Sequence, residues 1–323
     1  VEVGGKVVLV MPDESGAQHG WRFTDGASTS TETSGVNNAP TITFTAPSSS
    51  TPTATTVGYT LGTRTLLFTV GLNDLAQGTE HELTIGNVLT PSSIVGGNNV
   101  VATTRDSADK NVDTTSSMST DAITAGGLAS ATFATATDTP GFESVATVSF
   151  KTAGRVEVGG KVVLVMPDES GAQHGWRFTD GASTSTETSG VNNAPTITFI
   201  TPASHRPTAN AVKYNNTLRT LAFSVESTRM AQSSQFAFSV TNVLAPPSIV
   251  GGNNVVATAR DSADKNVDTA SSMSTDAITA GGPASATFAT ATDTPGFEGV
   301  ATVSFKTAGR VEVGGKVVLV MPD

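Results

Sequence analysis

The sequence contains no cysteine, so no disulfide can cross-link the fold and no thiol can serve as a nucleophile. Charge is scarce as well, with 18 Lys and Arg against 28 Asp and Glu and a net charge of −10. Binding of nucleic acid depends on clustered Lys and Arg that neutralise phosphates, so this composition argues against nucleic acid and against an anionic membrane surface as partners. No apolar run approaches the roughly 18–20 residues that span a bilayer, and we expect no membrane insertion by these residues.

The absence of cysteine does not by itself choose a compartment, because it suits a cytosolic protein as well as a secreted one. Ser, Thr, Gly and Ala are abundant, whereas Lys and Glu are few. Polar, uncharged surfaces of this kind are typical of secreted repetitive proteins. We therefore expect an extracellular or cell-surface location, although a chain that starts on valine in mid-repeat says nothing about a signal peptide or an anchor.

What the sequence does contain is a long tandem repeat. The segment VEVGGKVVLVMPD occurs at Val1–Asp13, Val156–Asp168 and Val311–Asp323, which gives a period of 155 residues. If a unit opens at Leu128 and closes at Gly282, the chain divides into residues 1–127, a repeat lacking its first strands, residues 128–282, a complete repeat, and residues 283–323, the first strands of the next repeat. A unit of this size buries about 68–70% of its unfolded surface and needs no metal or disulfide for stability.

Within the complete repeat, short apolar segments alternate with polar residues. Ala146, Val148 and Phe150 fall on one face of such a segment, and the intervening Thr147 and Ser149 fall on the other. This period of two predicts half-buried antiparallel strands, and turn residues separate them. We predict an all-β fold of tandem immunoglobulin-like antiparallel β-sandwich repeats. The expected strands are 129–137, 145–152, 162–166, 196–200, 212–214, 221–225, 236–240, 255–259 and 267–270.

The copies differ from one another in a single block. Residues 1–44 are identical to 156–199, and residues 93–155 differ from 248–310 only at Thr104/Ala259, Thr115/Ala270, Leu128/Pro283 and Ser144/Gly299. Residues 45–92 differ from their counterparts at most positions, yet they keep the apolar alternation. Either stretches of DNA were duplicated recently, or the constant block makes repeat-to-repeat contacts while the variable block faces outward or distinguishes two unit types.

A cluster of acidic residues is the strongest candidate for a metal site. Oxygen ligands in a short loop suit calcium, but the spacing, glycine and terminal glutamate of an EF-hand are missing. Asp and Asn are also ordinary turn residues between strands, so the sequence leaves a plain turn and a calcium site open. The candidate ligands are Asp106, Asp109, Asn111 and Asp113, with their copies Asp261, Asp264, Asn266 and Asp268.

Three other motifs are candidates for a chemical role. The Gly-Gly-Lys of VEVGGKVV lacks the spacing and the hydroxyl residue of a phosphate loop and predicts a hairpin turn. His174, Trp176 and Arg177, with His19 as the copy of His174, suit either a carbohydrate-stacking platform or a tryptophan in the core. Asn215 begins an Asn-Asn-Thr acceptor for an N-linked glycan. No nucleophile elbow or other catalytic arrangement is present, and we expect no enzymatic activity and no bound cofactor other than calcium.

Taken together, three stretches carry a resemblance to a known class of protein. They are ASATFATATDTPGFESVATVSFKTAGRVEVGGKVVLVMPD, FAFSVTNVLAPPS and NVVATARDSADKNVDTASS. Their succession resembles the tandem immunoglobulin-like repeats of very large surface proteins of protists and bacteria, such as flagellar-hair and cell-envelope fibre proteins. The resemblance implies an extracellular array, with glycans where sites are occupied, and it brings no catalytic residues.

These observations favour a structural subunit of an extracellular filament, whose partners are neighbouring repeats or copies of itself. The alternatives are the stalk region of a cell-surface adhesin and a carbohydrate-binding module. Residues 283–323 repeat the opening strands that residues 1–127 lack, which has two explanations: the segment belongs to a continuous fibre, or strands are exchanged between consecutive chains.

Overall fold

The fold is seen in a computed structural model that describes residues 1–12, 20–23, 40–167, 175–179, 195–215, 217–252 and 254–321, with the side chains of 115–117 and 270–272 excepted. The chain divides into two compact units. Unit 1 comprises Val1–Gly126, Gly154–Glu157 and Arg260–Val267, and unit 2 comprises Gly127–Ala153, Val158–Ala259 and Asp268–Asp323. The division after Gly126 lies one residue from the repeat boundary at Leu128.

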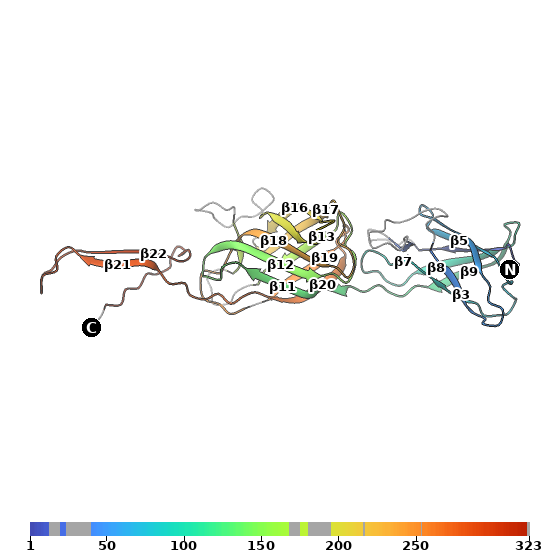
Figure 1. The fold of residues 1–323 in the computed structure, drawn as a ribbon, viewed down its shortest axis with the longest axis horizontal. Helices are drawn as coiled ribbons and strands as arrows, with labels where there is room; N and C mark the ends of the chain where they lie inside the picture. The colour runs from blue at the N-terminus through green and yellow to red at the C-terminus, as the bar shows by residue number, and fades with distance from the viewer. Residues whose placement is uncertain are drawn as a thin grey trace. The chain divides into compact units, whose positions relative to one another are not determined.

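Every regular element of the described residues is a β-strand, and the paired strands run antiparallel (Figure 1). The predicted class, an all-β chain of antiparallel sandwich repeats, is confirmed. The described residues form no helix, so they contain no helix long and apolar enough to cross a membrane.

Unit 2 holds a complete two-layer sandwich. One sheet has the order β10-β20-β19-β13-β17-β16, and the facing sheet has the order β11-β12-β18-β14, with β15 also paired to β18. The strands are β10 Gly126–Gly127, β11 Ala129–Thr135, β12 Glu143–Lys151, β13 Lys161–Val165, β14 Arg177–Phe178, β15 Ile197–Thr201, β16 Thr208–Asn215, β17 Thr220–Glu226, β18 Gln235–Leu244, β19 Asn254–Arg260 and β20 Asn266–Ser274.

The alternation of apolar and polar residues in the sequence coincides with the alternation of buried and exposed side chains in this sandwich. Ala146, Val148 and Phe150 on β12 are fully buried, and so is Leu164 on β13. Phe238 of β18 lies at the centre of an aromatic cluster. Apolar side chains on the inner faces of two stacked sheets account for a core that needs no cross-link.

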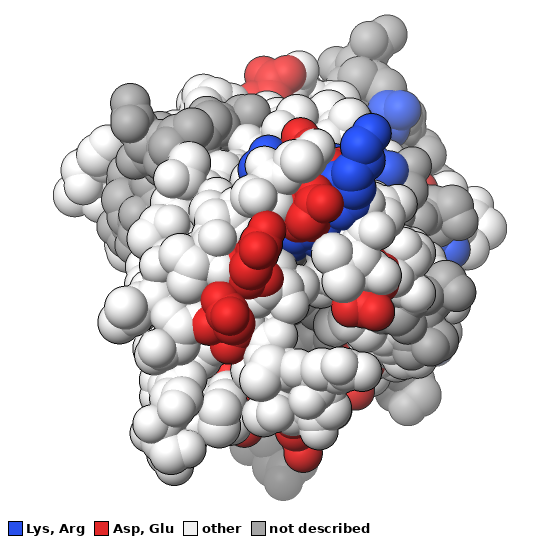
Figure 2. Space-filling view, turned by 90° about the vertical axis from the view of Figure 1, so that its right-hand side faces the viewer, with Lys and Arg blue, Asp and Glu red and all other residues white. Residues whose placement is uncertain are grey.

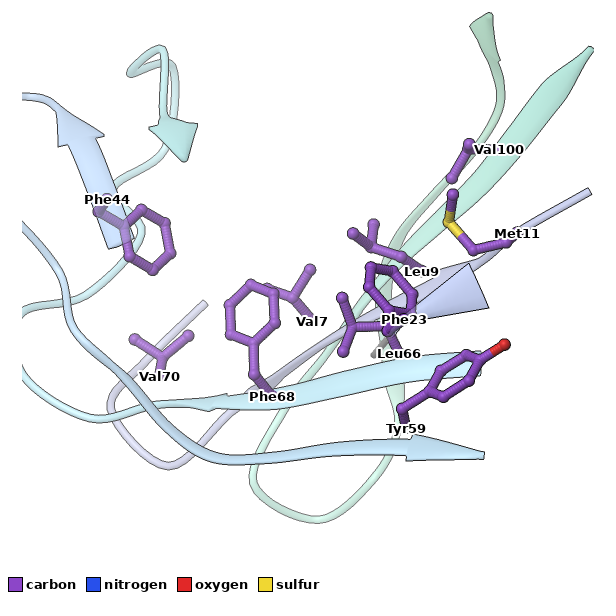
Figure 3. Packing of buried hydrophobic residues seen from close by; sticks show 10 residues of the cluster. All are labelled: Val7, Leu9, Met11, Phe23, Phe44, Tyr59, Leu66, Phe68, Val70 and Val100. Atoms are coloured by element: carbon purple, nitrogen blue, oxygen red, sulfur yellow. The ribbon is translucent and has the colours of Figure 1, made fainter. Parts of the chain in front are cut away.

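Unit 1 repeats this architecture with fewer strands. It contains a five-stranded sheet, β4-β5-β1-β8-β9, and two two-stranded sheets, β3-β6 and β2-β7. Figure 3 shows its core, in which Phe44 of β3 points toward Phe68 and Val70 of β5. The strands are β1 Lys6–Val10, β2 Arg22–Phe23, β3 Ile42–Ala46, β4 Ala54–Thr60, β5 Thr65–Val70, β6 Glu82–Ile85, β7 Val88–Leu89, β8 Asn99–Arg105 and β9 Asn111–Ser119.

A third, smaller piece lies in the last part of unit 2. β21 Ala284–Thr290 and β22 Ala301–Lys306 form a two-stranded sheet by themselves. Their sequence repeats that of β11 and β12, and the register repeats too, since Phe288 lies opposite Val303 as Phe133 lies opposite Val148. The same hairpin therefore occurs twice, once covered by a sheet and once uncovered.

Candidate functional site

The first loop of the acidic cluster is held by its own aspartate. Asp106 Oδ1 accepts hydrogen bonds from the backbone N–H groups of Ala108 (2.9 Å) and Lys110 (2.7 Å). Asp261 accepts the equivalent pair of bonds, both at 2.9 Å. An aspartate that binds the backbone two and four residues further on closes a tight turn between strands, here β8–β9 and β19–β20.

The other acidic side chains of the cluster also have protein partners. Lys6 Nζ lies 3.0 Å from Asp109 Oδ1, and the hydrogen bond and charge of Lys6 hold the pKa of that carboxyl below its usual range, with Arg105 adding to the effect. Asp113 accepts from Thr104 Oγ1 at 3.1 Å. Asp268 accepts from the N–H of Ala153 at 3.1 Å.

These contacts give the turn interpretation a physical basis. Among the described residues, no group of three or more His, Asp or Glu side chains is arranged to hold a metal ion. Asp264 Oδ1 lies 3.8 Å from Arg260 Nη1. The backbone oxygen of Asn266 accepts a hydrogen bond from the N–H of Ile94. Asn111 is the first residue of β9. A calcium site at these residues stays a prediction.

We expect a calcium chelator to leave the melting temperature of this protein unchanged, because the carboxylate oxygens already accept hydrogen bonds and ion pairs from the protein. The measurement is a thermal melt in excess EDTA, in excess CaCl2 and in MgCl2 as the control for ionic strength. A rise in melting temperature with calcium that magnesium does not reproduce would instead establish the metal site.

Burial differs between the two copies of the acidic loop. Asp261 is 1% exposed, and its Oδ2 accepts hydrogen bonds from Ser93 Oγ (2.8 Å) and Ser92 Oγ (3.4 Å), all within unit 1. Asp106 is partly exposed. In the second copy, the aspartate that closes the turn therefore also contacts two serines that lie 169 and 168 residues earlier in the chain.

An ion pair recurs one repeat apart and was not predicted. In unit 1, Glu157 Oε1 lies 3.3 Å from Arg22 Nη2 and 2.5 Å from Arg155 Nη2, and the three side chains are 12%, 7% and 11% exposed. In unit 2, Arg177 Nη2 lies 3.0 Å from Glu312 Oε1. Each pair joins the short strand β2 or β14 to the VEVGG segment of the following repeat.

The sequence carried a usable signal for this pair. Charged residues are rare in the chain, yet this Arg and this Glu are kept in every copy that contains their position. A buried charge survives only when it is paired, so a repeated Arg and a repeated Glu in a chain with 14% charged residues favour an ion pair. On the face drawn in Figure 2, acidic and basic side chains lie next to one another, and most of the described surface carries no charge.

Trp176 and the Gly-Gly-Lys segment contribute to the fold. Trp176 is fully buried, with its ring 5.7 Å from that of Phe133, so it belongs to the core and presents no stacking surface for a sugar. His19 and His174 lie outside the described residues. Glycine 4 of the Gly-Gly-Lys segment has a φ of 87° and the N–H of Gly5 donates to the oxygen of Glu2 at 2.9 Å, the geometry of a glycine-dependent turn.

Asn215 stands where an enzyme could reach it. It is exposed at the end of β16, Thr217 is exposed two residues later, and Asn215 Oδ1 accepts the N–H of Leu218 at 3.0 Å. That bond uses the amide oxygen, whereas an N-linked glycan attaches to the amide nitrogen. Glycosylation at Asn215 stays a proposal.

Unit 1 contains an apolar groove of about 910 Å³. Both layers of the sandwich line it, and Figure 3 shows three of the lining residues, Val7, Leu9 and Phe44. Among its lining residues are Leu83 and Ile85 of β6 and Val112 and Met118 of β9.

The equivalent residues of the next repeat are more deeply buried. Val112 is 51% exposed and Met118 is 45% exposed, whereas Val267 is 7% exposed and Met273 is fully buried. The residue types are identical, so the difference comes from what covers them. We take the recurrent ion pair, which each of the two units contains, as the candidate functional site.

Comparison with protein-family models finds no match, and comparison with curated protein sequences finds none. Among solved structures, the chain is similar to the C-terminal domain of the AgI/II polypeptide BspA of Streptococcus agalactiae, with 11% identity, 84% of each chain covered and a TM-score of 0.26. It is similar to the C-terminal domain of the antigen I/II-family protein AspA of Streptococcus pyogenes, with 10% identity, 84% and 85% covered and a TM-score of 0.25. The collagen adhesin of S. aureus gives 8% identity, 84% and 82% covered and a TM-score of 0.23. Similarity of this degree does not extend to function.

Proposed function

We propose that this chain is a structural subunit of an extracellular filament or surface fibre built from tandem β-sandwich repeats, with no enzymatic role. The observation that carries the proposal is the recurrent ion pair between segments of successive repeats, Arg22 with Glu157 and Arg177 with Glu312. Contacts made in the same way by each repeat with the next are what a quasi-one-dimensional array requires.

Two further features support a load-bearing role over a binding role. Trp176, the aromatic residue best placed by sequence to stack on a sugar, is enclosed in the core. The acidic loops use their carboxylates to close turns and to contact serines of unit 1. In this proposal, the partners are neighbouring repeats or further copies of the chain.

The proposal is tested by electron microscopy of the native material, with antibodies raised against residues 45–92 and, separately, residues 200–247. These blocks differ in sequence, so the two antibodies distinguish the two unit types. We expect both labels along uniform fibres outside the cell. A thin stalk ending in a distinct head would support the adhesin alternative, and label confined to the cell interior would refute both.

An extracellular location also predicts a glycan at Asn215. The intact mass of the native protein should fall after treatment with an N-glycosidase, and the peptide that contains Asn215 should carry the change. A native peptide of unmodified mass would remove this part of the proposal.

A further inference from the structure

Among the described residues, five strands lie at the edges of the two sheets in the sandwich of unit 2. β10 and β14 are only two residues long. β11, β15 and β16 are longer, and each has a register shift, a β-bulge, against the strand it pairs with. An exposed edge pairs readily with another chain unless it is short or distorted. All five edges are therefore poor templates for the addition of a regular strand.

The bulge of β16 lies in the middle of the strand. Asn210 lies opposite Ser224 on β17, and Lys213 lies opposite Ala222, so a step of three residues on β16 meets a step of two on β17. Ala211, within the longer step, has a φ of 48°, in the left-handed region that residues other than glycine rarely adopt. A bulge interrupts the hydrogen-bond ladder and bends the strand. The outer edge of β16 is irregular for this reason.

The same bulge occurs in unit 1 on a different sequence. β4 is an edge strand of the five-stranded sheet, and its register shift against β5 lies at the equivalent position. Thr56, the counterpart of Ala211, has a φ of 47°. The two strands belong to the variable block, and their segments ATTVGYT and ANAVKYN share only the Ala, Val and Tyr. The bulge is kept although the residue at its centre changes and is glycine in neither copy.

The facing sheet of unit 2 has an equivalent feature on β11. Ser130 has a φ of 49° and lies at the register shift of β11 against β12. Thr56, Ser130 and Ala211 are all exposed, so none of these side chains packs in a core. A residue persists in an unfavourable backbone region only where the surrounding structure or a function maintains it. Core packing by these three side chains does not supply that reason.

Polar side chains of β16 add to the effect of its bulge. Asn210 Oδ1 accepts a hydrogen bond from the N–H of Ala211 at 2.7 Å, and Asn210 Nδ2 donates to Glu226 Oε1. The N–H of the bulge residue is therefore already bonded within the chain. Lys213 follows on the same strand and is exposed. A lysine on an edge strand places a charge where a second strand would have to approach.

We propose that these bulges prevent the sheet edges from pairing with the edges of a second copy of this chain. Near-identical repeats on one chain bring many similar edges together at a high effective concentration, and misassembly between repeats is a characteristic failure of such proteins. A distorted edge removes that route while the inner faces still pack. The inference goes beyond the proposed function, because it applies to a filament and to a stalk alike.

Deletion of Ala211 tests the proposal. It removes the extra residue, so that Val212 falls opposite Phe223 and the ladder between β16 and β17 becomes regular. The side chain that is lost is an exposed methyl group. Because a regular edge offers backbone hydrogen bonds that the bulge interrupts, self-association of the whole chain should become about tenfold stronger or more. Sedimentation velocity over a range of concentrations measures the change against the unmodified chain, and circular dichroism checks the fold.

The matched control is Ala211→Gly. It keeps the extra residue, and glycine adopts a positive φ freely, so this variant should sediment as the unmodified chain does. Amide hydrogen exchange locates the new contact, since peptides from β16 belong to the variable block and occur once in the chain. In the deletion variant these peptides should gain protection as the concentration rises.

Four results would overturn the proposal. They are a folded deletion variant that sediments as the unmodified chain does, an equal gain of association in Ala211→Gly, new protection that lies outside β16, and loss of the fold in both deletions described here. The second deletion is that of Thr56 in β4, which decides the matter if the chain without Ala211 does not fold. Any of these results would leave the proposed function standing, because that proposal depends on the recurrent ion pair.

Discussion

Replacing Phe238 with alanine should lower the free energy of unfolding of unit 2 by about 3–5 kcal/mol, as for other phenylalanines removed from a packed core. Phe238 is fully buried on β18, with its ring centroid 5.2 Å from Phe223, 5.4 Å from Phe199 and 6.1 Å from Phe150. Its removal leaves a cavity facing strands of both sheets. Aromatic pairs at these distances add to the burial of area, so the loss should fall in the upper part of the range for core residues.

The chain contains its own control for this substitution. Leu83 is the equivalent residue in unit 1, and it is only partly buried beside the open groove. Leu83→Ala should cost unit 1 less than about 2 kcal/mol. Equal losses at the two positions would contradict the difference in burial.

Each unit must be measured separately, because a chain of two units need not unfold in one step. Amide hydrogen exchange read by mass spectrometry gives a local free energy for each unit from its own peptides. Peptides from β5 and β6 differ in sequence from those of β17 and β18, so the signals can be assigned. Peptides from the constant blocks have the same sequence in both units, so their exchange cannot be assigned to one unit.

The sequence predicted the strands well because alternation and turn residues are local signals. All nine predicted segments overlap strands of the complete repeat, from β11 to β20. The two-residue strands β10 and β14 were missed, since a pair of residues has no periodicity to detect. How far a neighbouring segment buries a strand is not a local property of the sequence. Met118 and Met273 have the same residues around them, yet Met118 is 45% exposed and Met273 is buried.

The candidate site was harder to predict than the fold for the same reason. The site is a side-chain contact, and the alternation of apolar and polar residues that predicts strands says nothing of which charged residues meet. The recurrent ion pair depends on a contact between residues 135 positions apart. By contrast, the prediction of a turn at the aspartates rested on the local preference of Asp and Asn for turns. The hydrogen bonds of Asp106 to the backbone agree with that preference.

Replacing Glu157 with glutamine should lower the free energy of unfolding of unit 1 by about 3 kcal/mol, the low end of the cost of breaking a buried ion pair. Glu157 accepts from Arg155 Nε at 2.6 Å and from Arg22 Nη2 at 3.3 Å. Glutamine keeps the shape but not the charge, so two largely buried guanidinium groups lose their ion pair with this carboxylate. The measurement is the exchange of amides in β5, whose peptides belong to unit 1 alone.

Glu2 and Glu312 occupy the same position in the other copies and calibrate this result. Glu2 is exposed and accepts a hydrogen bond from Ser107 Oγ at 3.1 Å, so Glu2→Gln should change stability by less than about 0.5 kcal/mol. Glu312, 19% exposed with Arg177 as its partner, should give an intermediate loss in unit 2. If Glu157→Gln cost no more than Glu2→Gln, the pair would have no energetic role. A repeat-to-repeat contact would then have to depend on the buried bonds between Asp261 and Ser93 instead.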